Sequence, residues 1–191
     1  MNTREVIAAR RSIRQFKMDA LPKHAVDEIL KAASLAPSGK NRQPWRFILV
    51  EGEKRAEMMD VMHEMLKQWE ERGEDTGSAK WTAEIMAQAP LTVFVMNPHG
   101  IDPWEQHSVD QMFQELVDVQ SIGAAIQNMA LAAQDLDIGS LWICDVLYAI
   151  SELKQWLGED GELVAAMSFG YPDEAPEARP RKPMNEIVRE L

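Results

Sequence analysis

Hydrophobic and polar positions follow both strand and helix periods along the chain. Four short apolar runs, at residues 47–50, 91–96, 141–143 and 163–169, have the length and composition of buried strands. Longer stretches with helical spacing separate these runs. The alternation predicts one sheet with helices packed on it, in an α+β or α/β domain.

Local signals mark the ends of the first two predicted helices. Asn2 and Glu5 have the spacing of a capping pair, which predicts a short helix that ends near Arg10. A second helix is predicted over residues 22–35, with a proline in its first turn and Pro37 beyond its end. The N-terminal helix therefore leads directly into a loop.

The longest helical pattern runs from Val109 to Leu136. Its first half is amphipathic, whereas residues 123–133 are apolar or small nearly all round. A helix of that kind is buried on most sides. The simplest cover is the sheet on one side and a second subunit on the other. Periodicity alone leaves a purely intramolecular core helix as an equal alternative.

Composition limits the class of protein. With 191 residues, 46% of them hydrophobic, and no visible repeat, we expect residues 1–191 to form a single domain. A formal net charge of −11 argues against nucleic acid and anionic membranes as partners. No apolar stretch has membrane-spanning length and no export signal is visible, so we expect a cytoplasmic protein. The single cysteine, Cys144, excludes an internal disulfide and a cysteine metal cluster.

Two basic clusters stand out in this acidic chain. One lies in "AARRSIRQFKMD" (8–19), and the other ends the proline-rich stretch "GYPDEAPEARPRKP" (170–183). Their basic residues are Arg10, Arg11, Arg14 and Lys17, and Arg179, Arg181 and Lys182. Either cluster alone is typical of a solvated surface. Together they suggest that the two chain ends converge on one dianionic group, because arginine binds phosphate by paired donors as well as by charge.

A third motif lies between the second helix and the first strand. The loop "APSGKNRQPW" (36–45) carries more polar side chains than a simple turn needs. The motifs "RRSIRQF", "APSGKNRQPWRFILV" and "GYPDEAPEARPRKP", in this order and spacing, resemble the nitroreductase family of FMN-dependent, dimeric flavoenzymes. They extend from Arg10 to Pro183, so the resemblance covers essentially the whole chain.

The resemblance implies an α+β fold with a central, mostly antiparallel sheet flanked by helices. It also implies a homodimer with the long helix in the interface and a C-terminal segment that reaches the partner. FMN would lie between the subunits, in two identical sites. No metal site is implied.

The resemblance also assigns site residues. Arg10, Ser12 and Arg14 would hold the phosphate, the ribityl chain and the pyrimidine edge of the ring. Arg179 and Arg181 would close on the phosphate, while Ser38 and Asn41 would reach the cofactor of the other subunit. Arg11 and Lys182 would either join them or lie at the surface beside the site. The implied cofactor contacts are Arg10, Arg11, Ser12, Arg14, Ser38, Asn41, Trp142, Ile143, Cys144, Arg179 and Arg181.

The stretch "DIGSLWICDV" (137–146) matches the family segment that passes the flavin ring. A backbone N–H at Cys144, or at Asp145, would face the reactive N5. Family members often have glycine, another small residue or glutamate here, so Cys144 is a departure, and we interpret it as an inert, small apolar residue. No side chain is assigned as a catalytic acid or base.

The implied reaction is ping-pong hydride transfer from NADH or NADPH to a nitroaromatic, a quinone or a similar acceptor. The chain has no GxGxxG pattern, so a separate dinucleotide-binding domain is not expected. Aromatic and histidine residues that could cover the flavin are Trp69, Trp81, His99, Trp104 and His107.

Other functions remain open at this point. An enzyme of the same fold could reductively dehalogenate an aromatic compound or use oxygen as its substrate. A flavin-binding protein without turnover and a dimeric scaffold with solvated basic ends are further alternatives.

Overall fold

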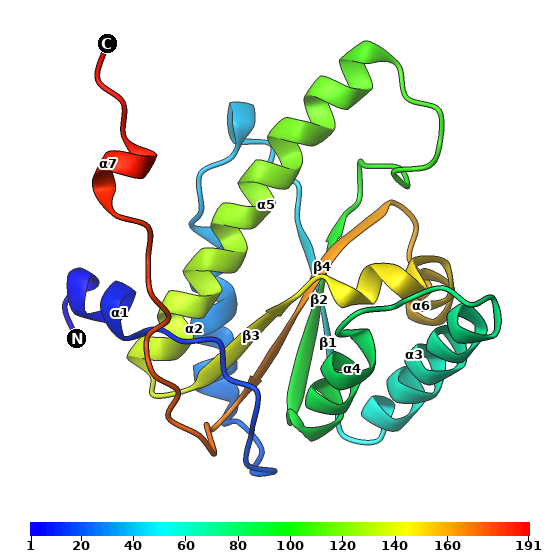
Figure 1. Ribbon diagram of the computed structural model, residues 1–191, viewed down its shortest axis with the longest axis horizontal. Helices are drawn as coiled ribbons and strands as arrows, with labels where there is room; N and C mark the ends of the chain where they lie inside the picture. Colours follow the sequence, from blue (N-terminus) through cyan, green and yellow to red (C-terminus); the bar gives the residue numbers. More distant parts are fainter.

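Four strands form one sheet between two layers of helices in the computed structural model, which describes residues 1–191 (Figure 1). The strands are β1 (Arg46–Glu51), β2 (Leu91–Asn97), β3 (Gly139–Ile143) and β4 (Glu162–Gly170). Their order is β1-β2-β4-β3, and all neighbouring strands are antiparallel. Each apolar run of the sequence is therefore a strand, and the α+β class is confirmed.

Seven α-helices and two short 3-10 helices complete the fold. The α-helices are α1 (Thr3–Ala9), α2 (Lys23–Ser34), α3 (Lys54–Glu71), α4 (Ala79–Gln88), α5 (Val109–Asp135), α6 (Ile150–Leu157) and α7 (Met184–Ile187). The 3-10 helices are η1 (Gly39–Asn41) and η2 (Asp145–Ala149). None of the helices combines the length and the apolar character that crossing a lipid bilayer requires.

Helix ends follow the local signals closely. Asn2 caps α1, and the reciprocal bond from its backbone to the Glu5 side chain completes the predicted capping box. Pro22 is the N-cap of α2 and not part of its first turn, so the helix begins one residue later than predicted. An unforeseen capping box at Ser108 starts α5.

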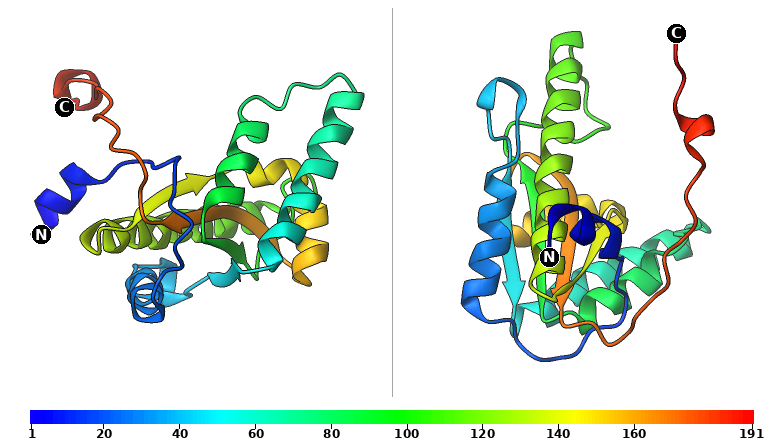
Figure 2. Two further views of the ribbon diagram at one scale, coloured as in Figure 1. Left: turned by 90° about the horizontal axis from the view of Figure 1, so that it is seen from below. Right: turned by 90° about the vertical axis from the view of Figure 1, so that its left-hand side faces the viewer.

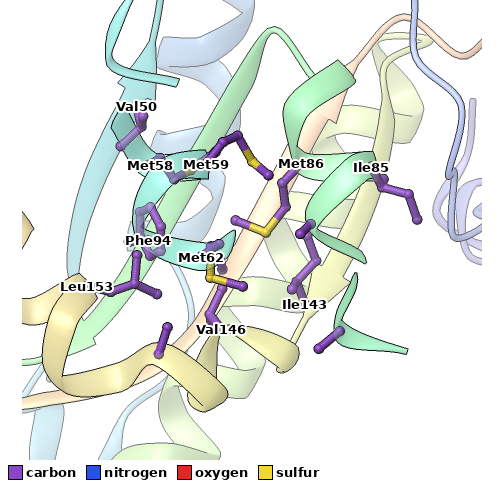
Figure 3. Packing of buried hydrophobic residues seen from close by; sticks show 14 of the residues in the cluster. Val50, Met58, Met59, Met62, Ile85, Met86, Phe94, Ile143, Val146 and Leu153 are labelled. Atoms are coloured by element: carbon purple, nitrogen blue, oxygen red, sulfur yellow. The ribbon is translucent and has the colours of Figure 1, made fainter. Parts of the chain in front are cut away.

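The two faces of the sheet carry separate cores. Along β2, Phe94 faces α3, α4 and α6, while Val93 and Val95 face α2 and α5. Figure 3 shows the first core, where methionines of α3 and α4 pack against one face of the sheet. Flexible methionine side chains fill the irregular space between helices and sheet.

The second half of α5 is buried mainly by the chain itself. Ile122, Ile126 and Met129 are completely buried in the core that α5 forms with α2 and the sheet. The chain itself therefore covers one side of this stretch, while Gly123, Ala124, Leu131 and Ala132 on the other side are only half-buried. Large apolar side chains are exposed on the first half of α5: Val109, Met112, Phe113, Leu116, Val117 and Val119.

The two chain ends run side by side next to β3 and β4 (Figure 2). The backbone N–H of Lys17 donates to the carbonyl of Tyr171 at 2.9 Å, and that of Asp173 donates to the carbonyl of Gln15 at 2.9 Å. Gly139 allows the N-terminal segment to approach the sheet, since a Cβ there would lie 2.9 Å from Ile13. This pairing brings the two basic motifs together.

Candidate active site

Both chain ends contribute to a basic pocket of about 140 Å³. Its lining residues are Arg10, Arg11, Ser12, Arg14, Pro176, Glu177, Arg179 and Arg181. Five arginines thus face one glutamate, and no hydrophobic residue takes part. The predicted convergence of the two motifs is present within a single chain, and the pocket has the charge that a phosphate dianion requires.

Glu174 fastens the C-terminal segment to the basic loop. Its carboxylate Oε1 accepts the backbone N–H of Arg14 in a short hydrogen bond and the backbone N–H of Gln15 at 3.2 Å. Sequence reasoning missed this residue, although Glu174 lies inside the C-terminal motif. The sequence feature that could have indicated this role is the position of an acidic residue a few places before the basic cluster at Arg179 and Arg181.

Arg11 has a structural role as well as a place in the pocket wall. Its Nη1 donates to the carbonyls of Ala8, Ala9 and Arg10 at 2.7, 3.0 and 2.9 Å. These are carbonyls at the end of α1 that lack helical partners. Arg11 therefore caps the helix that leads into the basic loop.

Arg14 lies between the basic pocket and a second pocket of about 190 Å³, which we name the ring pocket. Its Nη1 donates to the carbonyl of Ser12 at 3.1 Å, and its guanidinium carbon lies 5.5 Å from the ring centroid of Trp81. The ring pocket is lined by Arg14, Ser78, Trp81, Thr82, Ile85, Leu141, Trp142, Ile143, Cys144 and Asp145. The predicted residues Trp142, Ile143 and Cys144 therefore lie next to the basic pocket.

One face of α4 forms a wall of the ring pocket. Ser78, Trp81, Thr82 and Ile85 have i, i+3, i+4, i+7 spacing, which places them on the same side of the helix. Ile85 also belongs to the core shown in Figure 3. Sequence reasoning named Trp81 among several candidates but missed the other three, whose helical spacing around Trp81 was visible.

Asp145 connects that wall to the start of η2. Its Oδ2 accepts the hydroxyl of Ser78 at 2.9 Å and the hydroxyl of Thr82 at 2.5 Å. Cys144, the preceding residue, is exposed, yet partial burial of its thiol raises its pKa, and the charge of Asp145 raises that pKa further. A thiol with a raised pKa is a poor nucleophile at neutral pH, which agrees with the inert role expected from the sequence.

The other candidates for the pocket wall lie elsewhere. Trp69 donates its indole N–H to the carbonyl of Tyr148 at 2.9 Å and packs edge-on against that ring. Trp104 is exposed, and His107 lies 2.7 Å from a Glu115 carboxylate oxygen. No group of histidine, cysteine and acidic residues is arranged to hold a metal ion.

Ser38 and Asn41 line neither pocket of their own chain. Their loop is fixed to α5, where Gly39 donates its backbone N–H to Ser121 Oγ at 3.3 Å and Arg42 pairs with the buried Asp118 at 3.1 Å. Figure 1 shows this loop next to α5. Ser38 and Asn41 could therefore contact a cofactor only in a dimer, where they would reach the cofactor bound by the partner subunit.

The same loop has a strained backbone. Lys40, Asn41 and Gln43 have φ angles of 53°, 56° and 52°, in the left-handed region that costs a residue with a side chain about 1–3 kcal/mol. The backbone N–H of Gln43 donates to Ser38 Oγ at 3.0 Å, which closes the turn. Such strain persists where surrounding contacts fix the conformation.

The antiparallel sheet between two helical layers is a fold that known proteins share. The chain belongs to the nitroreductase family, whose sequence profile matches residues 7–171. A nitroreductase-like protein of Desulfovibrio desulfuricans, crystallised in complex with FMN, superposes with a TM-score of 0.77 at 27% identity, over 100% of this chain and 97% of the other.

Curated relatives extend the comparison to different reactions. YfhC of Bacillus subtilis, provisionally named an NAD(P)H nitroreductase, is 28% identical over 191 residues, which are 98% of this chain and 93% of YfhC. Iodotyrosine deiodinase of Thermotoga neapolitana is 26% identical over 94% of this chain and 91% of the relative. The match therefore establishes the family, but the names of these relatives describe different reactions.

Proposed function

We propose that the protein is a homodimeric, FMN-dependent oxidoreductase that uses NADH or NADPH to reduce small aromatic acceptors such as nitroaromatics or quinones. One observation carries the proposal: a pocket of five arginines adjoins, through Arg14, a pocket with aromatic and aliphatic walls. A flavin mononucleotide has the matching chemistry, with a phosphate dianion at one end and a planar ring at the other.

The residues present fit each part of that cofactor. Arg10, Arg179 and Arg181 would bind the phosphate, and Ser12 would contact the ribityl chain. Arg14 would contact the pyrimidine edge, since it belongs to both pockets. A backbone N–H at Cys144 or Asp145 would face the reactive side of the ring. When bound, FMN supplies the two-electron chemistry that the protein's own side chains lack, and the protein binds and orients it.

A dimer is supported by two features of α5. Its first half exposes a continuous apolar stripe that includes Met112, Phe113 and Leu116, which is unfavourable in water. The strained loop that carries Ser38 and Asn41 is fixed to the same helix. A second copy packed on this helix would bury the stripe and bring Ser38 and Asn41 to the partner's cofactor.

Reductive dehalogenation is the alternative favoured by a specific finding, the similarity to iodotyrosine deiodinase. Either reaction would place an aromatic compound beside the flavin, on the exposed Trp81 side of the ring pocket. The choice of acceptor therefore has to be measured.

The test begins with the absorption spectrum of the purified protein and titration of the flavin-free protein with FMN and riboflavin. Oxidation of NADH and NADPH is then followed with a nitroaromatic, a quinone and an iodinated phenol as acceptors. Turnover with the first two supports the proposal, and turnover with the iodinated phenol alone supports dehalogenation. A protein that binds no FMN contradicts both, and rapid flavin reduction without acceptor turnover indicates a non-catalytic flavoprotein. Light scattering of the FMN-loaded protein tests the dimer.

A further inference from the structure

Asp145 places a carboxylate in the wall of the ring pocket. Two hydroxyl groups, from the N-cap residue Ser78 and from Thr82 within α4, donate to the same oxygen, Oδ2. These neutral donors fix the carboxylate in position without cancelling its charge. The geometry therefore holds one negative group beside the segment assigned to the reactive side of the flavin.

No cation neutralises this carboxylate. None of the ion pairs in the structure includes Asp145. Arg14 is the basic residue of the pocket wall, and its guanidinium donates to the carbonyl of Ser12 and lies above the Trp81 ring. Burial is the main cause of the raised pKa of the Cys144 thiol, and the negative charge of Asp145 is the second cause.

An aromatic surface lies on the same wall. Trp81 is one turn along α4 from Ser78 and remains 57% exposed, so an acceptor ring has access to it. Aromatic rings pack favourably on tryptophan in offset or edge-on arrangements. An acceptor bound against Trp81 would therefore lie close to the Asp145 carboxylate.

We propose that Asp145 makes the acceptor position beside the bound flavin, on the exposed Trp81 side of the ring pocket, selective by charge, so that neutral or cationic aromatic acceptors are favoured over anionic ones. The inference rests on the proposed function, since it concerns the acceptor of the same site. Charges separated by several ångströms near a protein surface alter binding by about three- to tenfold. That factor sets the size of the expected effect.

The test uses three non-reducible probes of similar shape: benzoate, benzamide and benzyltrimethylammonium. Their dissociation constants for the FMN-loaded protein are measured from changes in flavin absorbance, which is independent of turnover. In Asp145→Asn, benzoate should gain about three- to tenfold in affinity relative to benzamide, and benzyltrimethylammonium should lose a similar factor. The kcat/KM values for 4-nitrobenzoate and 4-nitrobenzamide should shift in the same direction.

Two control variants separate charge at the pocket from other effects. Glu84→Gln removes an equal charge from α4 outside the ring pocket, where Glu84 pairs with His63, and should leave the ratios unchanged. Ser78→Ala removes one hydroxyl but keeps the carboxylate, and it should retain the discrimination.

An unchanged benzoate-to-benzamide ratio in a folded Asp145→Asn variant overturns the inference. If that variant does not fold, equal affinity of the parent protein for benzoate and benzamide overturns it instead. Absence of bound FMN refutes the proposed function, a separate result. In that case, the benzoate and benzamide titrations are made on the flavin-free protein and followed by tryptophan fluorescence. The ratio of the two dissociation constants in the parent and in Asp145→Asn then decides the inference in the same way.

Discussion

Replacing Glu174 by alanine should weaken FMN binding without unfolding the protein. The substitution removes the carboxylate that accepts the backbone N–H groups of Arg14 and Gln15. Hydrogen bonds to a charged group contribute about 1.5–3 kcal/mol each when buried, and partial exposure reduces this to about 1 kcal/mol each. Two backbone hydrogen bonds, from Lys17 and Asp173, remain and hold the chain up to residue 173.

The lost contacts, about 2 kcal/mol together, therefore affect the part of the chain that carries Arg179 and Arg181. If FMN binding has to supply this ordering, the Kd rises by up to about 30-fold. Flavin fluorescence titration of the flavin-free protein at constant ionic strength measures the change, and thermal unfolding reports the fold. Glu177→Ala is the matched control, because it removes a negative charge from the basic pocket and should tighten binding. Equal Kd values for the parent and Glu174→Ala would refute the reasoning.

Three further predictions concern single charges. Arg181→Ala should raise the Kd for FMN more than tenfold but leave riboflavin binding unchanged, because only FMN has the phosphate; equal losses in the two titrations would contradict the assignment. Arg14→Gln should lower the flavin midpoint potential by about 20–45 mV, measured by spectroelectrochemistry, since a cation at the pyrimidine edge stabilises the reduced, anionic ring; an unchanged potential would place Arg14 outside the site. Burial raises the pKa of Glu162 above the ordinary glutamate value of about 4.3, so ionisation of this carboxyl at higher pH destabilises the folded state. Glu162→Gln should therefore be more stable than the parent in urea unfolding at pH 8, and the gain should be smaller at pH 5.

The fold was largely predictable because its signals are local. Strands such as β2 are continuous apolar runs, and the Asn2–Glu5 pair marks the start of α1 within four residues. Burial of the second half of α5 was also visible in the pattern. The neighbour that provides the burial was not, because periodicity describes a helix face and carries no information about what packs on it.

Half of the site was predictable for a different reason. The arginines have distinctive chemistry, so their residue type and clustering pointed to an anion site, whereas Trp142, Ile143 and Cys144 were implied only by the resemblance to the nitroreductase family. Ser78 and Thr82 each act through one hydrogen bond and Glu174 through two, with partners 63 to 160 positions away. Serine, threonine and glutamate are common at surfaces, and only the folded chain shows which of them meet a partner.

Arg14 shows why the two pockets should respond together. Glu174 holds its backbone N–H, the Ser12 carbonyl accepts from its guanidinium, and the guanidinium lies above Trp81. The basic pocket and the ring pocket therefore share one side chain whose position depends on contacts in both. A substitution that moves Arg14 from either direction alters the charge at the phosphate end and the surface presented to the acceptor. If the protein has the proposed function, we therefore expect cofactor binding and acceptor choice to be coupled through this residue, by contacts from three segments far apart in the sequence.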